Sequence, residues 1–119
     1  MDDAGAKVID LIFGRKRSHM LYVGVTLGVF DALAHGPRSA ASVASALNVD
    51  VGLLYRLMRV LSSLELLHED DTKTFSLTPM GERLCRDQPH TLRGVALWEE
   101  GPESYATWKP LATLITEGQ

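Results

Sequence analysis

Residues 51–64 read VGLLYRLMRVLSSL, and this stretch decides the fold. Its apolar residues recur at intervals of three and four, the spacing that places side chains on one face of an α-helix. Asp50 stands just before the stretch, where its carboxylate can accept hydrogen bonds from free backbone N–H groups and so begin the helix. The pattern predicts an amphipathic helix whose apolar face is covered by the rest of the domain. That face is formed by Leu53, Leu54, Leu57, Met58, Leu61 and Leu64.

A small hairpin and a short helix are predicted downstream. Residues 66–68 are followed by the polar turn 69–73, and residues 74–77 then alternate with a period of two, which is typical of a β-strand. Thr78 followed by Pro79 is a helix cap with proline at the first helical position. We therefore expect a two-stranded hairpin followed by a short helix that runs to Leu84.

Two short helices are predicted upstream of residue 51. Residues 29–34 form the first, closed by the turn His35-Gly36-Pro37. Ser39 caps the second, which ends at Asn48, a residue that tolerates the left-handed conformation. Three short helices followed by a two-stranded hairpin form a winged-helix arrangement. We assign residues 29–84 to this core.

Further helices flank the winged-helix core on both sides. Residues 3–13 form a first amphipathic helix that Gly14 ends, and residues 18–27 form a second that is apolar nearly all round. Residues 91–100 and 103–117 form two more, with a bend at Pro110 because its ring removes a backbone donor. The fold class is therefore mainly α, a winged-helix-like domain with a small β-hairpin, in one domain over residues 1–119.

Composition narrows the class of protein. A chain of 119 residues with 45% hydrophobic content can build one compact core. The net charge of −3 gives no overall attraction to nucleic acid or to an anionic membrane surface, so neither is an expected partner. No apolar run approaches the length of a membrane span. The single cysteine, Cys85, and the acidic N-terminus without a leader pattern indicate a cytoplasmic protein.

An ordered set of motifs resembles a known family. The segments are residues 27–33 (LGVFDAL), 54–59 (LYRLMR), 75–81 (FSLTPMG), 92–94 (LRG) and 116–118 (TEG), together with Tyr105, Trp108 and Leu111. They resemble the N-terminal winged-helix dimerisation domain of the S-adenosylmethionine (SAM)-dependent small-molecule O-methyltransferases of the hydroxyindole and bacterial polyketide-tailoring type. The resemblance covers nearly the whole chain.

The resemblance implies a domain that is intertwined with its twin across a two-fold axis. Residues 1–28 would be dimerisation helices, and residues 90–119 would lead to a catalytic domain that binds SAM and methylates a small aromatic or polyketide-like molecule. The sequence stops at Gln119, before such a domain, and no two of its glycines form a GxG pair. We therefore expect this chain alone to bind no cofactor and to carry no catalytic residue, which leaves its status as an enzyme open.

Two groups of residues are candidates for contacts. Apolar helices outnumber the places where one copy can cover them, so we expect a homodimer that interlocks through the first two helices and the C-terminal pair. We expect it to bury roughly 2,000 Å² or more. The expected dimer-interface residues are Ile9, Ile12, Phe13, Met20, Leu21 and Val25. The resemblance places the C-terminal aromatic residues over the small-molecule acceptor, so the possible lining of the substrate pocket is Trp98, Tyr105 and Trp108. Ordinary core packing explains these aromatic residues about as well.

Two other functions fit the same pattern. A winged-helix DNA-binding transcriptional regulator would use the basic cluster 15–17 with Arg56 and Arg59, but the helix over residues 51–64 leaves only a narrow polar strip for contact with DNA. A freestanding partner subunit of a separate methyltransferase would pair with a chain encoded elsewhere. The four histidines are scattered without metal-ligand spacing, so we expect no metal site, and we expect Cys85 to be buried and inert.

Overall fold

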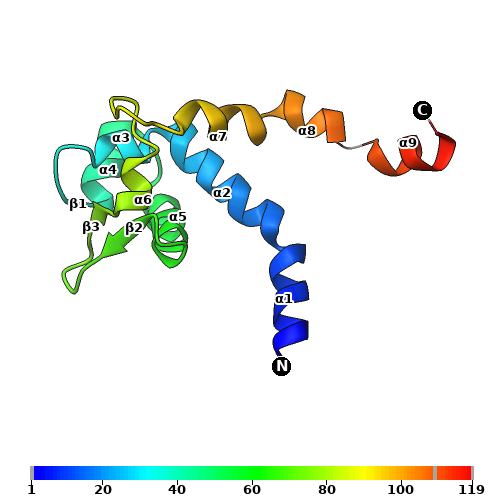
Figure 1. The fold of residues 1–119 in the computed structure, drawn as a ribbon. Helices are drawn as coiled ribbons and strands as arrows, with labels where there is room; N and C mark the ends of the chain where they lie inside the picture. Colours follow the sequence, from blue (N-terminus) through cyan, green and yellow to red (C-terminus); the bar gives the residue numbers. More distant parts are fainter. Residues whose placement is uncertain (1, 109, 119) are drawn as a thin grey trace.

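A winged-helix body carries two helical projections in the computed structural model of this chain, which describes residues 2–108 and 110–118 and, for residues 104 and 105, only the backbone (Figure 1). The predicted fold class, mainly helical with a small β-sheet, is confirmed. In chain order the elements are α1 (Asp3–Ile12), α2 (Gly14–Leu27), α3 (Val29–Ala32), β1 (Arg38–Ser39), α4 (Ala40–Leu47), α5 (Val51–Ser63), β2 (Leu67–Glu69), β3 (Thr74–Leu77), α6 (Pro79–Glu82), α7 (Arg93–Glu99), α8 (Pro102–Trp108) and α9 (Leu111–Glu117).

The sheet of the body has three antiparallel strands in the order β1-β3-β2. β3 pairs with β2 through Leu67 opposite Leu77, which is the predicted hairpin. β1 is the difference from the expectation: Arg38 pairs with Phe75 on the free edge of β3. A strand of two residues is too short to show a period-two alternation in the sequence. Ser39 was therefore predicted only as a helix cap.

The helices of the body begin and end at the capping residues that the sequence predicted. The Leu53 backbone N–H donates to Asp50 Oδ1 at 2.8 Å, which begins α5. Asn48 ends α4 with φ of 58°, in the left-handed region. Thr78 connects two elements because its hydroxyl accepts from Gly81 N at 3.1 Å and lies 2.6 Å from the carbonyl oxygen of Glu65. The body therefore begins and ends its helices by local hydrogen bonds.

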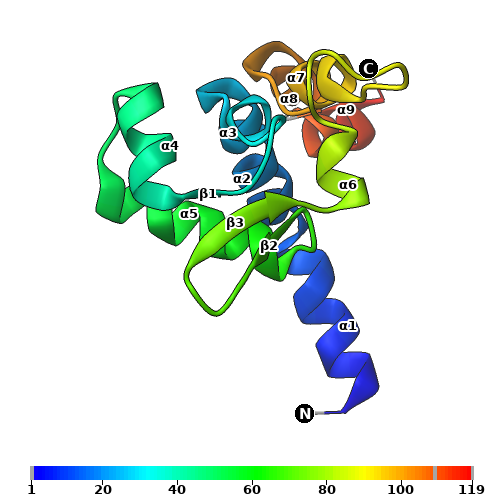
Figure 2. The ribbon, with the colours of Figure 1, turned by 90° about the vertical axis from the view of Figure 1, so that its left-hand side faces the viewer.

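One apolar core joins every layer of the body. α5 supplies Met58 and Leu61, β3 supplies Phe75, and α3 supplies Phe30, and each of these side chains is at most 1% exposed. Full burial of a side chain of this size stabilises the fold by roughly 1.5–3 kcal/mol. Figure 2 shows α4, α5 and the sheet gathered around this core, with α1 extending away from it. The body therefore has what it needs to fold as one unit.

The chain as a whole is extended. Its radius of gyration is 16.7 Å, and its principal dimensions are 53 × 36 × 29 Å. A compact chain of this length has a radius of gyration of about 13.5 Å. The excess comes from α1 and from the α7–α9 arm, which leave the body in different directions (Figure 1). Among the described helices, none combines the length and the hydropathy that a bilayer crossing requires.

Two predicted helix boundaries were wrong. α2 begins at Gly14 rather than at residue 18, so the basic residues 15–17 form its first turn, and the break between α1 and α2 lies at Phe13. The helix predicted over residues 103–117 is two helices, and Pro110 precedes the second. Gly14 tolerates the start of a helix, and a proline ring that removes a backbone donor ends one.

Gly81 gives a direct test of how tightly α6 packs on the body. A Cβ at this position would lie 2.1 Å from the carbonyl oxygen of Leu66, which is backbone and cannot rotate away. We expect Gly81→Ala to lower the free energy of unfolding by about 2 kcal/mol or more. Gly94→Ala is the matched control because a Cβ there meets no atom within 4 Å. Equal urea midpoints for the two variants would contradict this account.

Candidate dimer interface

α1 has a broad apolar surface that its own chain does not cover. None of its residues is buried, and Leu11 and Ile12 are 81% and 65% exposed. At 100° per residue, Val8, Ile9, Leu11 and Ile12 spread over an arc of roughly 160°, nearly half of the helix circumference. A helix with such a surface needs a partner to cover it.

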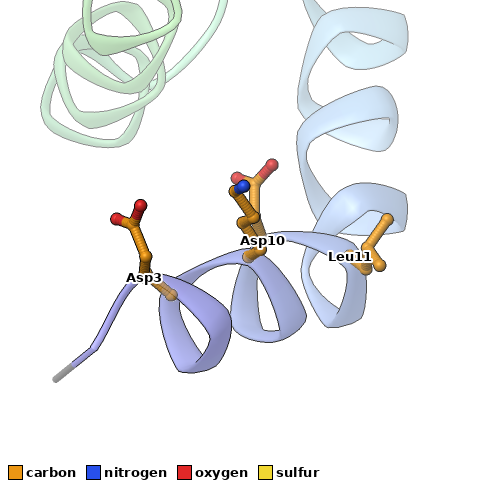
Figure 3. Close-up of a pocket in the computed structure, with 5 residues that line it drawn as sticks. Asp3, Asp10 and Leu11 are labelled. Atoms are coloured by element: carbon orange, nitrogen blue, oxygen red, sulfur yellow. The ribbon is translucent and has the colours of Figure 1, made fainter.

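The opposite side of α1 is charged. Asp3, Lys7 and Asp10 follow one another along it and line a shallow, open depression with Ala6 and Leu11. Figure 3 shows the carboxylates of Asp3 and Asp10 pointing to the same side of the helix, with Leu11 directed elsewhere. All five lining residues belong to a single exposed helix, so we interpret this side as the water-facing one.

Side-chain contacts at the corner between α1 and α2 stabilise the orientation of the two helices. The Arg17 guanidinium lies 2.9 Å from Asp10 Oδ1 and donates to the Asp10 carbonyl oxygen at 2.8 Å. Lys16 Nζ lies 4.9 Å from the centre of the Phe13 ring, a cation–π contact. Lys16 and Arg17 therefore stabilise a helix junction.

The expected interface residues on α2 divide into two groups. Met20 is 36% exposed and Leu21 is partly buried against the core. Val25 is 3% exposed and belongs to the core of a single copy, so its side chain is not available to a twin. The reason is that the C-terminal half of α2 packs on α5 while the N-terminal half continues toward α1. Ile9, Ile12 and Phe13 are exposed, with 37%, 65% and 44% of their surface accessible.

The α7–α9 arm carries a second exposed apolar surface, although Ala96 and Leu97 of α7 pack against the core. α7 and α9 have no buried residue. Trp98 and Trp108 are 62% and 63% exposed, and the side chain of Tyr105 lies outside the described residues. The sequence pointed to the C-terminal helices as part of the dimer contact, but none of their aliphatic residues was singled out as an interface candidate. These residues are Val95, Leu111, Leu114 and Ile115.

α5 is tied to the wing through one carboxylate. The Tyr55 hydroxyl donates to Glu69 Oε2 at 2.5 Å, and Arg59 Nε lies 3.5 Å from Glu69 Oε1. The hydrogen bond to Glu69 raises the pKa of Tyr55 above its ordinary value. Arg59, one of the two arginines that a DNA contact would use, is therefore held against the wing. Around Arg56 the exposed side of α5 also carries Leu53, which is 65% exposed.

An apolar groove of about 310 Å³ lies between α2 and α5. Val23 and Leu27 line it from α2, and Leu53 and Leu57 line it from α5. It continues the uncovered surface of α2 beyond Met20, on the helix that joins the body to α1. Apolar surface therefore extends along α2 on both sides of its buried turn.

Cys85 lies in the core and donates to the Phe30 carbonyl oxygen at 3.4 Å. Burial raises the pKa of its thiol, and the charge of nearby Asp31 adds to the effect. Within residues 2–108 and 110–118, no group of three or more histidine, cysteine or acidic side chains is placed to hold a metal ion.

The α1–α2 corner can be tested by hydrogen exchange. We expect Arg17→Ala to speed exchange of the α1 backbone amides, because the contacts with Asp10 that hold the corner are lost. Lys7→Ala is the control: it also removes one positive charge, from α1 itself, and should leave the protection of the α1 amides unchanged. Equal exchange of the two variants would show that Arg17 does not hold the corner.

The chain is similar to part of several longer proteins. It is 32% identical to the 8-amino-8-demethylriboflavin N,N-dimethyltransferase of Streptomyces davaonensis, over 87% of this chain and 30% of the relative. It is 30% identical to the phenazine-1-carboxylate N-methyltransferase of Pseudomonas aeruginosa, over 97% of this chain and 34% of the relative. The chain therefore spans about a third of the length of the relatives that it matches.

A solved structure shows the same architecture. Human N-acetylserotonin methyltransferase, in complex with SAM, superimposes with a TM-score of 0.88 at 28% identity. The superposition covers 100% of this chain and 36% of the human one. Residues 9–87, more than half of the chain, match the family profile of the O-methyltransferase dimerisation domain. The chain therefore belongs to the O-methyltransferase dimerisation domain family.

Proposed function

We propose that two copies of this chain pair through the exposed apolar surfaces of α1 and of the α7–α9 arm. One observation carries the proposal: both surfaces project from a body that already has a complete core, and the chain itself leaves them uncovered. A two-fold dimer brings the same two surfaces of each copy together, so every contact occurs twice. Membership of a dimerisation family supports the same conclusion.

The pairing serves a SAM-dependent methyltransferase that acts in the cytoplasm on a small aromatic or polyketide-like natural product. The catalytic domain stands next to this one, on the same chain or on a separate subunit. Relatives named for a riboflavin derivative and a phenazine carboxylate support an aromatic acceptor. We propose a hydroxyl as the methylated group, as the name of the family suggests.

The arm covers the acceptor while the methyl group is transferred. Trp98 and Trp108 present broad, rigid apolar surfaces at low cost in conformational entropy. Such rings stack on flat aromatic acceptors and keep water away from the reacting atoms. Residues outside this chain supply the binding of SAM and the chemistry.

Analytical ultracentrifugation tests the pairing. Ile12 is 65% exposed on α1, and Ile12→Asp would bring a charge into the interface. We expect this variant to weaken dimerisation by at least about tenfold, which corresponds to about 1.4 kcal/mol, with an unchanged circular dichroism spectrum. Met80→Asp is the matched control, because Met80 is 51% exposed on α6 of the body. A wild-type chain that stays monomeric at micromolar concentration would overturn the proposal.

Steady-state kinetics of the methyltransferase that contains this domain test the role of the arm. We expect Trp98→Ala to raise KM for the aromatic acceptor and to leave KM for SAM unchanged, because the ring contacts only the acceptor. Trp98→Phe keeps a flat ring and should restore most of the acceptor affinity. An acceptor KM that is equal in all three proteins would remove Trp98 from the pocket.

A further inference from the structure

One carboxylate joins the arm to α2 across a large separation in sequence. Glu100 follows the last residue of α7, and its side chain is only 17% exposed. The Ser18 hydroxyl donates to Glu100 Oε2 at 2.8 Å, although the two residues are 82 positions apart. His19 Nδ1 lies 3.8 Å from Glu100 Oε1. Glu100 therefore contacts two consecutive residues of α2.

The chain just after Glu100 runs through a confined space. Gly101 is buried, and a Cβ there would lie 2.6 Å from the carbonyl oxygen of Leu97, so the chain passes the end of α7 with no room for a side chain. Pro102 follows directly and begins α8 with a backbone angle fixed by its ring. The direction of α8 therefore depends on how the end of α7 is held.

Figure 1 shows why this position matters. α7 and α2 lie close together near the body and diverge from there, α2 toward α1 and α7 toward α8 and α9. Glu100 stands at the outer end of α7, and Ser18 and His19 belong to the half of α2 nearer to α1. The contacts of Glu100 therefore span the angle between the two projections.

The charges around this contact favour it. The first turn of α2 carries the cationic residues 15–17 and no acidic residue, although the N-terminal end of a helix dipole favours negative charge. Glu100 brings a carboxylate to the following turn from another part of the chain. The Ser18 hydrogen bond is charge-assisted and is therefore stronger than one between neutral groups.

We propose that Glu100 is a positioning residue: by binding Ser18 and His19 it fixes the angle between α2 and the α7–α9 arm. The consequence for pairing rests on the proposed dimer, because a two-fold interface needs both projecting surfaces at a defined angle. The contacts of Glu100 with Ser18 and His19, which we call the brace, require only one copy of the chain. The brace and the dimer can therefore be disproved separately.

Single-molecule FRET within one chain measures the angle. Donor and acceptor dyes are attached at Lys73→Cys, in the turn between β2 and β3, and at Glu117→Cys on α9. The native Cys85 is 2% exposed and can stay in place. The labelled chain is measured alone at high dilution and also with an excess of unlabelled chain, which separates the arm of one copy from the arm held by a twin.

In the chain measured alone, we expect Glu100→Ala to replace the single narrow distance peak by a broad, shifted distribution. Ser18→Ala, which removes one oxygen atom, should broaden the peak less. Glu100→Gln keeps an acceptor for the Ser18 hydroxyl and should restore most of the narrow peak. Glu99→Ala is the matched control, because Glu99 is an exposed glutamate that directly precedes Glu100.

A narrow, unshifted peak in Glu100→Ala would overturn the proposal, provided that the circular dichroism spectrum shows a folded chain. Broadening of equal size in Glu99→Ala would also overturn it, since the effect would then belong to any change at the end of α7. Sedimentation of the wild-type chain reports on dimer formation independently. If the wild-type chain is a monomer and its arm is rigid only when Glu100 is present, the proposed dimer is wrong and the brace is supported.

Discussion

The structure depends on the close approach of α2 to α5 and α3 at Gly24. A Cβ at this position would lie 3.0 Å from both Leu61 Cδ1 and Phe30 Cε2, which is tighter than ordinary contact. Glycine lets the backbone of α2 sit directly on these two core side chains, and Val25 enters the core beside it. This contact anchors one half of α2 in the body, so the other half must leave it and takes α1 along.

The same division separates stability from association. The body closes its core with side chains from α2, α3, α4, α5 and the sheet, and its free energy of folding comes from that burial. α1 and α9 bury no residue in one chain, so contacts such as those of Arg17 and Glu100 hold the directions of the projections without closing a core. A domain built in this way keeps the burial that folds its body apart from the exposed apolar surfaces of its projections.

A winged helix is often associated with DNA, and its local electrostatics here point elsewhere. Arg59 is held between Tyr55 and Glu69 at the wing, and Arg17 is held by Asp10 at a helix corner. Large exposed apolar side chains, including Leu53 and Val60, accompany the arginines on α5. One fold hosts many functions, and here the side chains on its surface favour contact with protein.

The amino-acid sequence by itself determined the body. Its helices carry apolar residues at spacings of three and four, and the capping residues Ser39, Asp50 and Thr78 stand where helices begin, because both signals act between near neighbours in the chain. The family resemblance could also be predicted, because its motifs are short and lie in order along the chain. Only β1 was missed, since two residues of strand become visible only when β3 lies beside them.

The tertiary structure alone decided which apolar residues are covered. Leu21, Val25 and Met20 look alike in a helix that is apolar all round, and only the packing of α2 on α5 buries Val25 and leaves Met20 exposed. The contacts of Glu100 with Ser18 and His19 could not be predicted either, because the two segments are more than eighty residues apart. Local patterns fix local structure, whereas burial and long-range contacts depend on where the chain returns in space.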